Sequence, residues 1–236
     1  MSQIRPRGLL CDYGGTLVEE IEFDTRAGNE MLLGRAAYRP SNVTLEQVME
    51  RAHKVSMEVA ARRDQFQLET PWPLLTRLIH DFLGIRFEAP LAELEIEFWK
   101  ASVRTRPMPG AREALEQFHR WGLPIGVVSN CSFAQDVLRY ELGKHGLAEN
   151  LAFVMVSAEY AVRKPSVLLF ETAAAKLGLK SDEVWFVGDR LDTDIAGAQA
   201  AGMTPVWFGA MNNGGSATPV LTASSWAEIV ALFQEL

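Results

Sequence analysis

Short apolar runs alternate with helical patterns through the second half of the chain, and this alternation limits the possible folds more than any other feature of the sequence. Each run is apolar at successive positions, which is typical of strands buried on both faces of a parallel sheet. The runs are residues 123–129, 151–156, 184–188 and 205–208, and residues 8–12 near the start of the chain resemble them.

Helical spacing occurs on either side of these runs. Apolar residues recur at i, i+3, i+4 and i+7, first at Ala111, Ala114, Leu115 and Phe118 and later at Trp226, Ile229, Val230 and Phe233. Such a stripe is the buried face of an amphipathic helix. Repeated strand–helix–strand units with right-handed crossovers give a doubly wound, mostly parallel sheet, so the sequence predicts an α/β fold.

Residues 19–106 differ from the rest of the chain, because their apolar positions keep helical spacing and no clear strand pattern interrupts them. One apolar stripe comprises Leu45, Val48, Ala52, Val55 and Val59. Thr44 and Gln47 predict a capping box at its start, and a second helix is predicted to start at Thr70. We therefore expect a core domain formed by residues 1–18 and 107–236, with an α-helical cap domain, residues 19–106, inserted as a lid.

Composition and charge exclude several classes of function. The 236 residues carry a net charge of −7, which disfavours a nucleic-acid partner whose phosphates Lys and Arg would have to neutralise. No apolar run is long enough to span a membrane and the polar start does not resemble a secretory signal, so we expect a cytoplasmic protein. The cysteines, Cys11 and Cys131, are too few for a disulfide framework and are expected to be reduced thiols.

Polar residues follow the apolar runs where parallel sheets bind ligands, beyond the carboxyl ends of their strands. In chain order they are Asp12, Ser129, Asn130, Lys164, Asp189, Asp192 and Asp194. Each alone is compatible with a turn or a solvated surface. Clustered carboxylates, however, repel one another unless a cation offsets their charge, which indicates a metal site.

In combination, these residues resemble the four motifs of the haloacid dehalogenase (HAD) superfamily. The family pattern is a strand ending in a nucleophilic Asp with a Thr four residues later, a strand ending in Ser or Thr, a Lys, and a Gly-Asp pair with a later Asp. The matching residues are Asp12, Thr16, Ser129, Lys164, Gly188, Asp189 and Asp194. The resemblance covers residues 6–24 and 107–236, and the insert is similar to the family's helical C1-type cap in position and helicity.

The resemblance implies a HAD-like Rossmannoid core and a phosphatase, that is, a phosphoric monoester hydrolase. Asp12 is then the nucleophile that forms an aspartyl-phosphate from a small phosphorylated metabolite. Ser129 and Lys164 hold the transferring oxygens and offset the developing charge. Thr16 and Asn130 belong to the same substrate site.

The family's metal site implies Mg²⁺ bound by Asp12, Asp189 and the backbone carbonyl of Gly14, with Asp194 supporting these ligands. Gly14 is also the main departure from the family pattern. Most HAD phosphatases carry a second Asp there, which protonates the leaving group and later activates the hydrolytic water. Its absence predicts weak activity on esters with poor leaving groups.

Two alternatives remain open. The 2-haloacid dehalogenases of this superfamily also lack the second Asp and need no metal, but their last motif lacks the Gly-Asp pair present here at Gly188 and Asp189. A HAD-like protein without its general acid could instead bind a phosphorylated ligand or a partner protein with little or no turnover. The acidic cluster favours the metal-dependent hydrolase, because it would be unfavourable without a cation.

Substrate specificity is expected to depend on the cap. Candidate residues are Tyr38, His53, Arg62, Arg63 and His80, each of which is also compatible with a surface or packing role. Residues 71–73, Pro-Trp-Pro, form either a rigid loop over the site or a helix start. Arg190 is expected to be exposed, and the Gly-rich residues 212–216 to be an ordinary connection.

Overall fold

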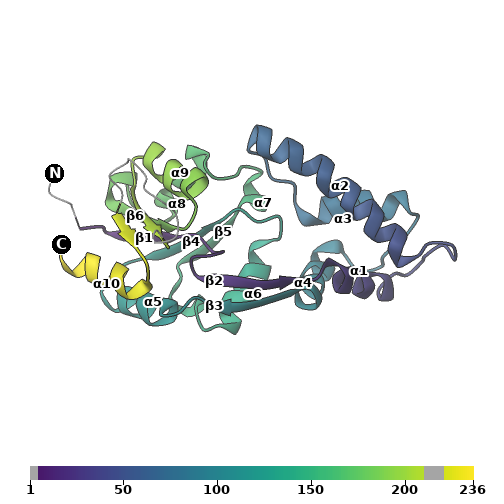
Figure 1. Cartoon of the computed structure of the whole chain (residues 1–236), viewed down its shortest axis with the longest axis horizontal. Coiled ribbons are helices and arrows are strands. Elements are labelled where there is room, and N and C mark those ends of the chain that lie inside the picture. Colours follow the sequence, from purple (N-terminus) through teal and green to yellow (C-terminus); the bar gives the residue numbers. More distant parts are fainter. Residues whose placement is uncertain (1–4, 210–220) are drawn as a thin grey trace.

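The computed structural model describes residues 5–209 and 221–236, apart from the side chain of Asp64; the connection expected at 212–216 lies outside this range. Within these residues, six parallel strands form the central sheet in the order β5-β4-β1-β6-β7-β8 (Figure 1). They are β1 (Gly8–Cys11), β4 (Ile125–Ser129), β5 (Phe153–Val156), β6 (Val184–Gly188), β7 (Thr204–Phe208) and β8 (Leu221–Ala223). The α/β fold predicted from the sequence is therefore confirmed.

Helices cover both faces of the sheet. Successive residues of a strand point to opposite sides, so neighbouring side chains pack against different helices. Leu9 and Cys11 of β1 pack with α5, α6 and α10, whereas Leu10 packs with α8 and α9. These helices are α5 (Ala111–Arg120), α6 (Gln135–Lys144), α8 (Val167–Lys176), α9 (Ala196–Ala200) and α10 (Trp226–Gln234). The two apolar stripes predicted from the sequence lie on α5 and α10 and are buried, Val230 only in part.

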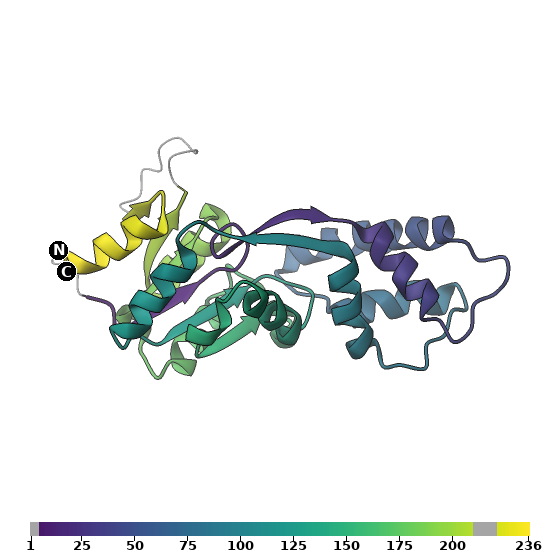
Figure 2. The ribbon, with the colours of Figure 1, turned by 90° about the horizontal axis from the view of Figure 1, so that it is seen from below.

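The segment 19–106 contains the expected helices but also strands, which corrects the expectation of an uninterrupted helical insert. Its helices are α1 (Thr25–Gly34), α2 (Leu45–Phe66), α3 (Trp72–Phe82) and α4 (Leu91–Ser102). An antiparallel ribbon of β2 (Val18–Phe23) and β3 (Val103–Pro107) joins them to the sheet (Figure 2). Charged residues pair across this ribbon, so it lacks an apolar run of the kind found in the core strands.

A small apolar core holds α2 and α3 together, with Val43, Val48, Val55, Ile79 and Ile85 as its buried residues. The capping box predicted at Thr44 and Gln47 is present.

Helix α3 begins at Trp72, not at Thr70. Its N-cap residue is Pro71, and no side chain caps the helix by a hydrogen bond. Trp72 is buried against Phe98 and Phe133. Residues 71–73 are therefore a helix start and not a loop over the site.

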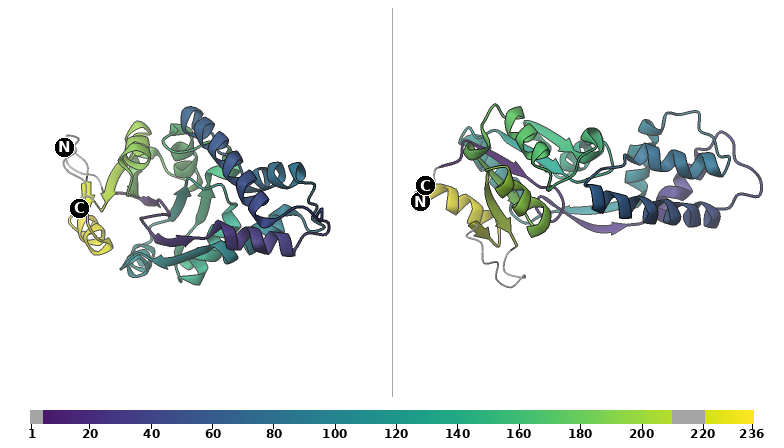
Figure 3. Two further views of the ribbon diagram at one scale, coloured as in Figure 1. Left: turned by 45° about the vertical axis from the view of Figure 1, so that its right-hand side comes forward. Right: turned by 90° about the horizontal axis from the view of Figure 1, so that it is seen from above.

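The ribbon leaves the sheet at the carboxyl end of β1, so α1–α4 lie beyond the edge at which the strands β1, β4 and β6 end. These helices occupy one end of the molecule and α10 the other (Figure 3). The remaining short elements are α7 (Ser157–Tyr160), the 3-10 turns Ala148–Asn150 and Ser181–Glu183, and the π-helical turn Leu191–Ile195. Among the helices of the described segments, none combines the length and apolar character needed to cross a membrane.

Candidate active site

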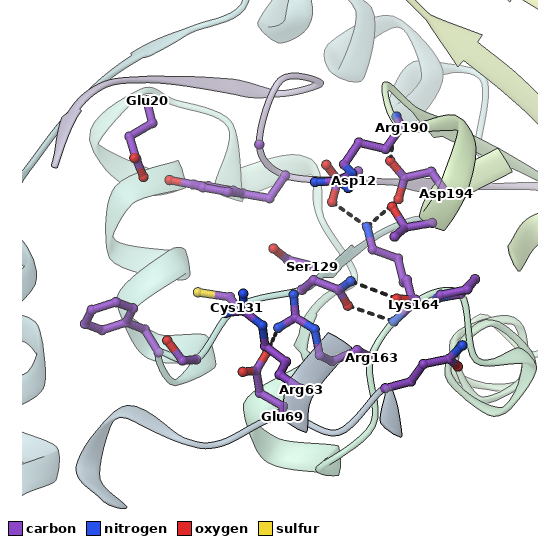
Figure 4. A pocket seen from close by; sticks show the side chains of 18 of the residues that line it. Asp12, Glu20, Arg63, Glu69, Ser129, Cys131, Arg163, Lys164, Arg190 and Asp194 are labelled. Carbon is purple, nitrogen blue, oxygen red and sulfur yellow. Dashed lines mark hydrogen bonds and ion pairs between the residues drawn. The ribbon is translucent and has the colours of Figure 1, made fainter. Parts of the chain in front are cut away.

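A cavity of about 890 Å³ lies where the loops after β1, β4 and β6 meet (Figure 4). Five of the side chains predicted for the site line it, namely Asp12, Ser129, Asn130, Lys164 and Asp194, and Gly14 lines it as well. Residues of the ribbon and of α2 line other parts of the cavity, including Glu20, Phe23 and Arg63. The fold thus gathers most of the predicted site around one space.

Asp12 directly follows β1, and its backbone N–H donates a hydrogen bond to the carbonyl of Val187 on β6 at 2.8 Å. This bond extends the sheet by one residue and fixes the position of the side chain. Asp12 is only 7% exposed. Burial, opposed by the charge of Lys164, raises the pKa of the Asp12 carboxyl to about 7.

Lys164 is buried and its ammonium lies between two carboxylates (Figure 4). Nζ is 2.5 Å from Oδ1 of Asp12 and 2.7 Å from Oδ1 of Asp194, and it donates to the carbonyl oxygen of Val128 at 2.9 Å. Burial opposes the ammonium charge, but Asp12 and Asp194 outweigh this effect and raise the pKa of Lys164. Lys164 therefore remains a cation inside the site.

Asn130 binds the backbone of Lys164 through both ends of its amide. The N–H of Lys164 donates to Oδ1 at 2.8 Å, and Nδ2 donates to the Lys164 carbonyl at 3.0 Å. These bonds hold the Lys164 backbone in place, and Asn130 also lines the cavity, so its contact with substrate stays a prediction. Ser129, the last residue of β4, is buried and lines the cavity beside Asn130.

The three carboxylates Asp12, Asp189 and Asp194 each place an oxygen within 4.8 Å of the others. Oδ1 of Asp189 is buried and has no hydrogen-bond partner in the described segments, and burial together with the charge of Asp194 raises the pKa of Asp189. Such a cluster requires a compensating charge. Oxygen donors and an unpartnered buried oxygen fit a hard divalent cation.

Gly14 and Gly15, in the loop after Asp12, differ in whether the structure requires a glycine at their position. Gly15 has a φ of +70°, and a Cβ there would lie 2.5 Å from Oδ2 of Asp189, so the loop needs glycine at this position. At Gly14 a Cβ would meet nothing within 4 Å among the described residues. The missing side chain of Gly14 therefore leaves open space beside the nucleophile.

Thr16 was expected to contact substrate, but it is fully buried and does not line the cavity. The chain turns inward after Gly15, and the Thr16 carbonyl accepts a hydrogen bond from Nε1 of Trp226 at 2.8 Å. Thr16 is therefore a packing residue of the loop, which corrects the expectation.

Of the cap candidates, Arg63 lines the cavity, whereas Tyr38, His53, Arg62 and His80 do not. The ring of Tyr38 lies under the guanidinium of Arg86, Arg62 pairs with Glu58, and Nδ1 of His80 lies 2.7 Å from the Thr76 carbonyl. His53 is exposed on α2. Arg190 is exposed as expected, but it also lines the cavity and forms an ion pair with Asp192 at 2.8 Å.

Sequence reasoning missed Glu69, a buried carboxylate in the segment between α2 and α3. It forms an ion pair with Arg163 and accepts a hydrogen bond from Oγ of Ser157 at 2.6 Å. The neighbouring backbone pairs with that of Arg163, whose N–H donates to the carbonyl of Gln67 at 2.9 Å. The only signal in the sequence was Arg163 itself, one residue before Lys164.

Comparison with known proteins identifies the family. A family model described as haloacid dehalogenase-like hydrolase matches residues 6–202. Ribulose-1,5-bisphosphate 5-phosphatase from Halopiger xanaduensis is 31% identical over 112 residues, which are 47% of this chain and 46% of that relative. Glyceraldehyde 3-phosphate phosphatase from Pyrococcus furiosus is 28% identical over 186 residues, 70% of this chain and 75% of that relative. The chain thus spans less than half of the first relative and three quarters of the second.

Solved structures share the fold over nearly the whole chain. A 2-haloacid dehalogenase from Pseudomonas syringae has a TM-score of 0.67, with 18% identity over 98% of this chain and 99% of its own. At this identity the likeness concerns the fold, and the family assignment rests on the model that matches residues 6–202. With that match, and with the motif residues Asp12, Ser129, Lys164 and Asp194 placed around one cavity, the chain belongs to the haloacid dehalogenase-like hydrolase family.

Proposed function

We propose that this protein is a Mg²⁺-dependent phosphatase that hydrolyses small phosphorylated metabolites through an aspartyl-phosphate on Asp12. The observation that carries the proposal is the contact of Asp12 with the buried ammonium of Lys164, beside the carboxylates of Asp189 and Asp194. A nucleophile, a phosphate-binding cation and an oxygen-rich metal site then share one end of the cavity. The relatives described above are phosphatases of small metabolites, which supports the same substrate class.

The residues divide the chemistry as follows. A carboxylate oxygen of Asp12 attacks phosphorus, and the ester oxygen departs with the electron pair of the P–O bond. Lys164 and the hydroxyl of Ser129 hold the phosphoryl oxygens and offset their charge. Water then attacks phosphorus, which releases inorganic phosphate and restores the Asp12 carboxylate.

The metal would be held by Asp12, Asp189 and the Gly14 carbonyl, with Asp194 supporting them. When bound, Mg²⁺ would neutralise the transferring phosphate and favour the ionised form of Asp12. Asp194 suits a supporting role, because Oδ1 is directed to Lys164 and Oδ2 accepts a hydrogen bond from the Arg190 backbone at 3.1 Å.

Helices α1–α4 act as the cap in this proposal, and the β2–β3 ribbon links them to the core. Arg63 and Glu69 bring the segment around the end of α2 to the cavity. Closure of this segment would exclude water while the phosphoryl group is transferred.

Two assays test the proposal against the dehalogenase alternative. We expect release of nitrophenol from para-nitrophenyl phosphate that requires Mg²⁺ and stops with EDTA. Release of halide from 2-chloropropionate in EDTA would instead establish the dehalogenase reaction. Silence in both assays would favour the noncatalytic binding protein.

A further inference from the structure

The cavity has one aromatic wall, formed by Phe23, Trp99 and Phe133. Phe133 contacts both of the others, with ring centroids 6.3 Å from Phe23 and 5.0 Å from Trp99. Trp99 and Phe133 are buried, whereas Phe23 is 43% exposed. The wall therefore presents an aromatic side chain that a ligand in the cavity could cover.

An irregularity in β2 brings Phe23 to this face of the ribbon. Val18 and Glu20 both line the cavity, and regular alternation along a strand would place Glu22 there next. The pairing register shifts between Glu20 and Glu22, so Phe23 lines the cavity instead, while Glu22 pairs with Arg104. Bulges near active sites commonly redirect a side chain in this way.

At the reacting end of the cavity, residue 14 lacks a side chain that could protonate the leaving group. An ester oxygen that departs without a proton leaves as an anion. This step is far easier for a phenol, whose anion is stabilised by the ring, than for an alcohol. The aromatic wall and the glycine at residue 14 line the same cavity and both favour a phenolic leaving group.

We propose that the preferred substrates are aryl phosphates, the phosphate monoesters of phenols, and that Phe23 packs against the ring of the leaving group. This inference rests on the proposed phosphatase function and specifies its substrate class. Asp12 forms the new bond to phosphorus, and the P–O bond breaks with its electron pair on the phenolate, which takes a proton from water. A cavity of about 890 Å³ has room for a ring beside the phosphate.

Four substrates separate the effect of the ring from that of the leaving group. Para-nitrophenyl phosphate has an aromatic ring and a good leaving group, whereas benzyl phosphate has a ring and a poor leaving group. Acetyl phosphate has a good leaving group without a ring, and propyl phosphate has neither a ring nor a good leaving group. We expect KM to be about 3- to 10-fold lower for benzyl than for propyl phosphate, the size of one aromatic contact. We expect kcat to be at least about 100-fold higher for acetyl than for propyl phosphate.

Phe23→Leu should remove most of the difference in KM between benzyl and propyl phosphate. The matched control is Phe66→Leu, because Phe66 is a phenylalanine on α2 that is 58% exposed and does not line the cavity. Phe66→Leu should retain the wild-type preference for the ring. Circular dichroism and the Tm would show whether both variants keep the fold.

Equal KM values for benzyl and propyl phosphate, or a ring preference that survives Phe23→Leu, would overturn the inference, and so would equal kcat values for acetyl and propyl phosphate. Absence of hydrolysis of all four substrates with Mg²⁺ would instead contradict the proposed function. In that case, calorimetry with benzylphosphonate and propylphosphonate, which cannot be hydrolysed, tests the ring site separately. Tighter binding of benzylphosphonate that Phe23→Leu abolishes would support the site, and equal binding would refute it.

Discussion

Asp12 and Lys164 form a buried ion pair, and the proposal assigns the covalent step to Asp12 alone. Asp12→Asn keeps the shape of the side chain but removes the nucleophilic carboxylate. We expect kcat to fall by at least about 10⁴-fold, as is typical when a nucleophile is removed. Steady-state kinetics on para-nitrophenyl phosphate measures this loss, and circular dichroism checks the fold.

The matched control for this variant is Asp192→Asn, because Asp192 also lines the cavity but is exposed and paired with Arg190. Its activity should stay within a few-fold of wild type, since exposed ion pairs contribute little. Appreciable turnover by purified Asp12→Asn would show that another group is the nucleophile.

Gly14 offers a gain-of-function test at the residue scale. A Cβ at residue 14 has open space, so Gly14→Asp can supply the missing general acid. We expect kcat for propyl phosphate to increase at least about 100-fold, the lower end of the roughly 10²- to 10⁴-fold range of general acid catalysis. The gain for para-nitrophenyl phosphate should be small, because its leaving group needs little protonation.

Gly15→Asp is the contrasting variant, because the same side chain one residue later meets Asp189 and a left-handed backbone. It should lose activity and stability. An unchanged rate on propyl phosphate in Gly14→Asp would indicate that another group already protonates the leaving oxygen.

The sequence predicted which residues surround the cavity more accurately than how each side chain is directed. Asp12 and Ser129 could be located because each lies at the end of an apolar run, where the strand determines its position. Thr16 and Asn130 lie in loops. The Thr16 backbone carbonyl accepts a hydrogen bond from Trp226, and the Asn130 amide is directed by its two hydrogen bonds to the Lys164 backbone. Local sequence patterns contain no signal for such contacts.

At the scale of elements, the five longer core strands and the buried faces of α5 and α10 were predictable because their apolar patterns match their burial. The β2–β3 ribbon was not, because its exposed faces carry charged residues such as Glu19 and Arg106. The described part of strand β8 has three residues, too few to show a pattern.

The contact between α4 and α6 contains a titratable group, Glu95, which is buried and accepts a hydrogen bond from the N–H of Ala134 at 3.0 Å. Burial raises the pKa of Glu95 from 4.5 to about 7. The folded protein therefore binds this proton more tightly than the unfolded chain does. The contribution of this proton to the free energy of unfolding is fully present below pH 4.5 and is lost as the pH rises through about 7.

Glu95→Gln should remove this pH dependence while keeping an oxygen for the Ala134 N–H. From pH 5 to pH 8, Glu95 should lower the free energy of unfolding of the wild type by on the order of 1 kcal/mol. The variant should not show this loss, so its stability should rise relative to that of the wild type by the same amount. Urea unfolding across this range measures the difference. Parallel curves for the two proteins would contradict the assignment.

At the scale of the whole molecule, the carboxylates of Asp12, Asp189 and Asp194 link metal binding to stability. Lys164 offsets one of the three negative charges, and the remaining repulsion opposes folding unless a further cation offsets it. We expect millimolar Mg²⁺ to raise the Tm of the wild type, since a ligand that binds only the folded state stabilises it. Asp189→Asn should greatly reduce this shift; a Tm that does not respond to Mg²⁺ in the wild type would contradict a metal site here.

The covalent intermediate on Asp12 distinguishes the proposed mechanism most directly, and mass spectrometry can detect it. The protein would be mixed with para-nitrophenyl phosphate and Mg²⁺, quenched in acid during turnover and digested. We expect one added phosphoryl group on the peptide that contains Asp12, lost on treatment with hydroxylamine and absent from Asp12→Asn. Turnover without any phosphoryl adduct on Asp12, or an adduct on a different residue, would contradict the proposed mechanism.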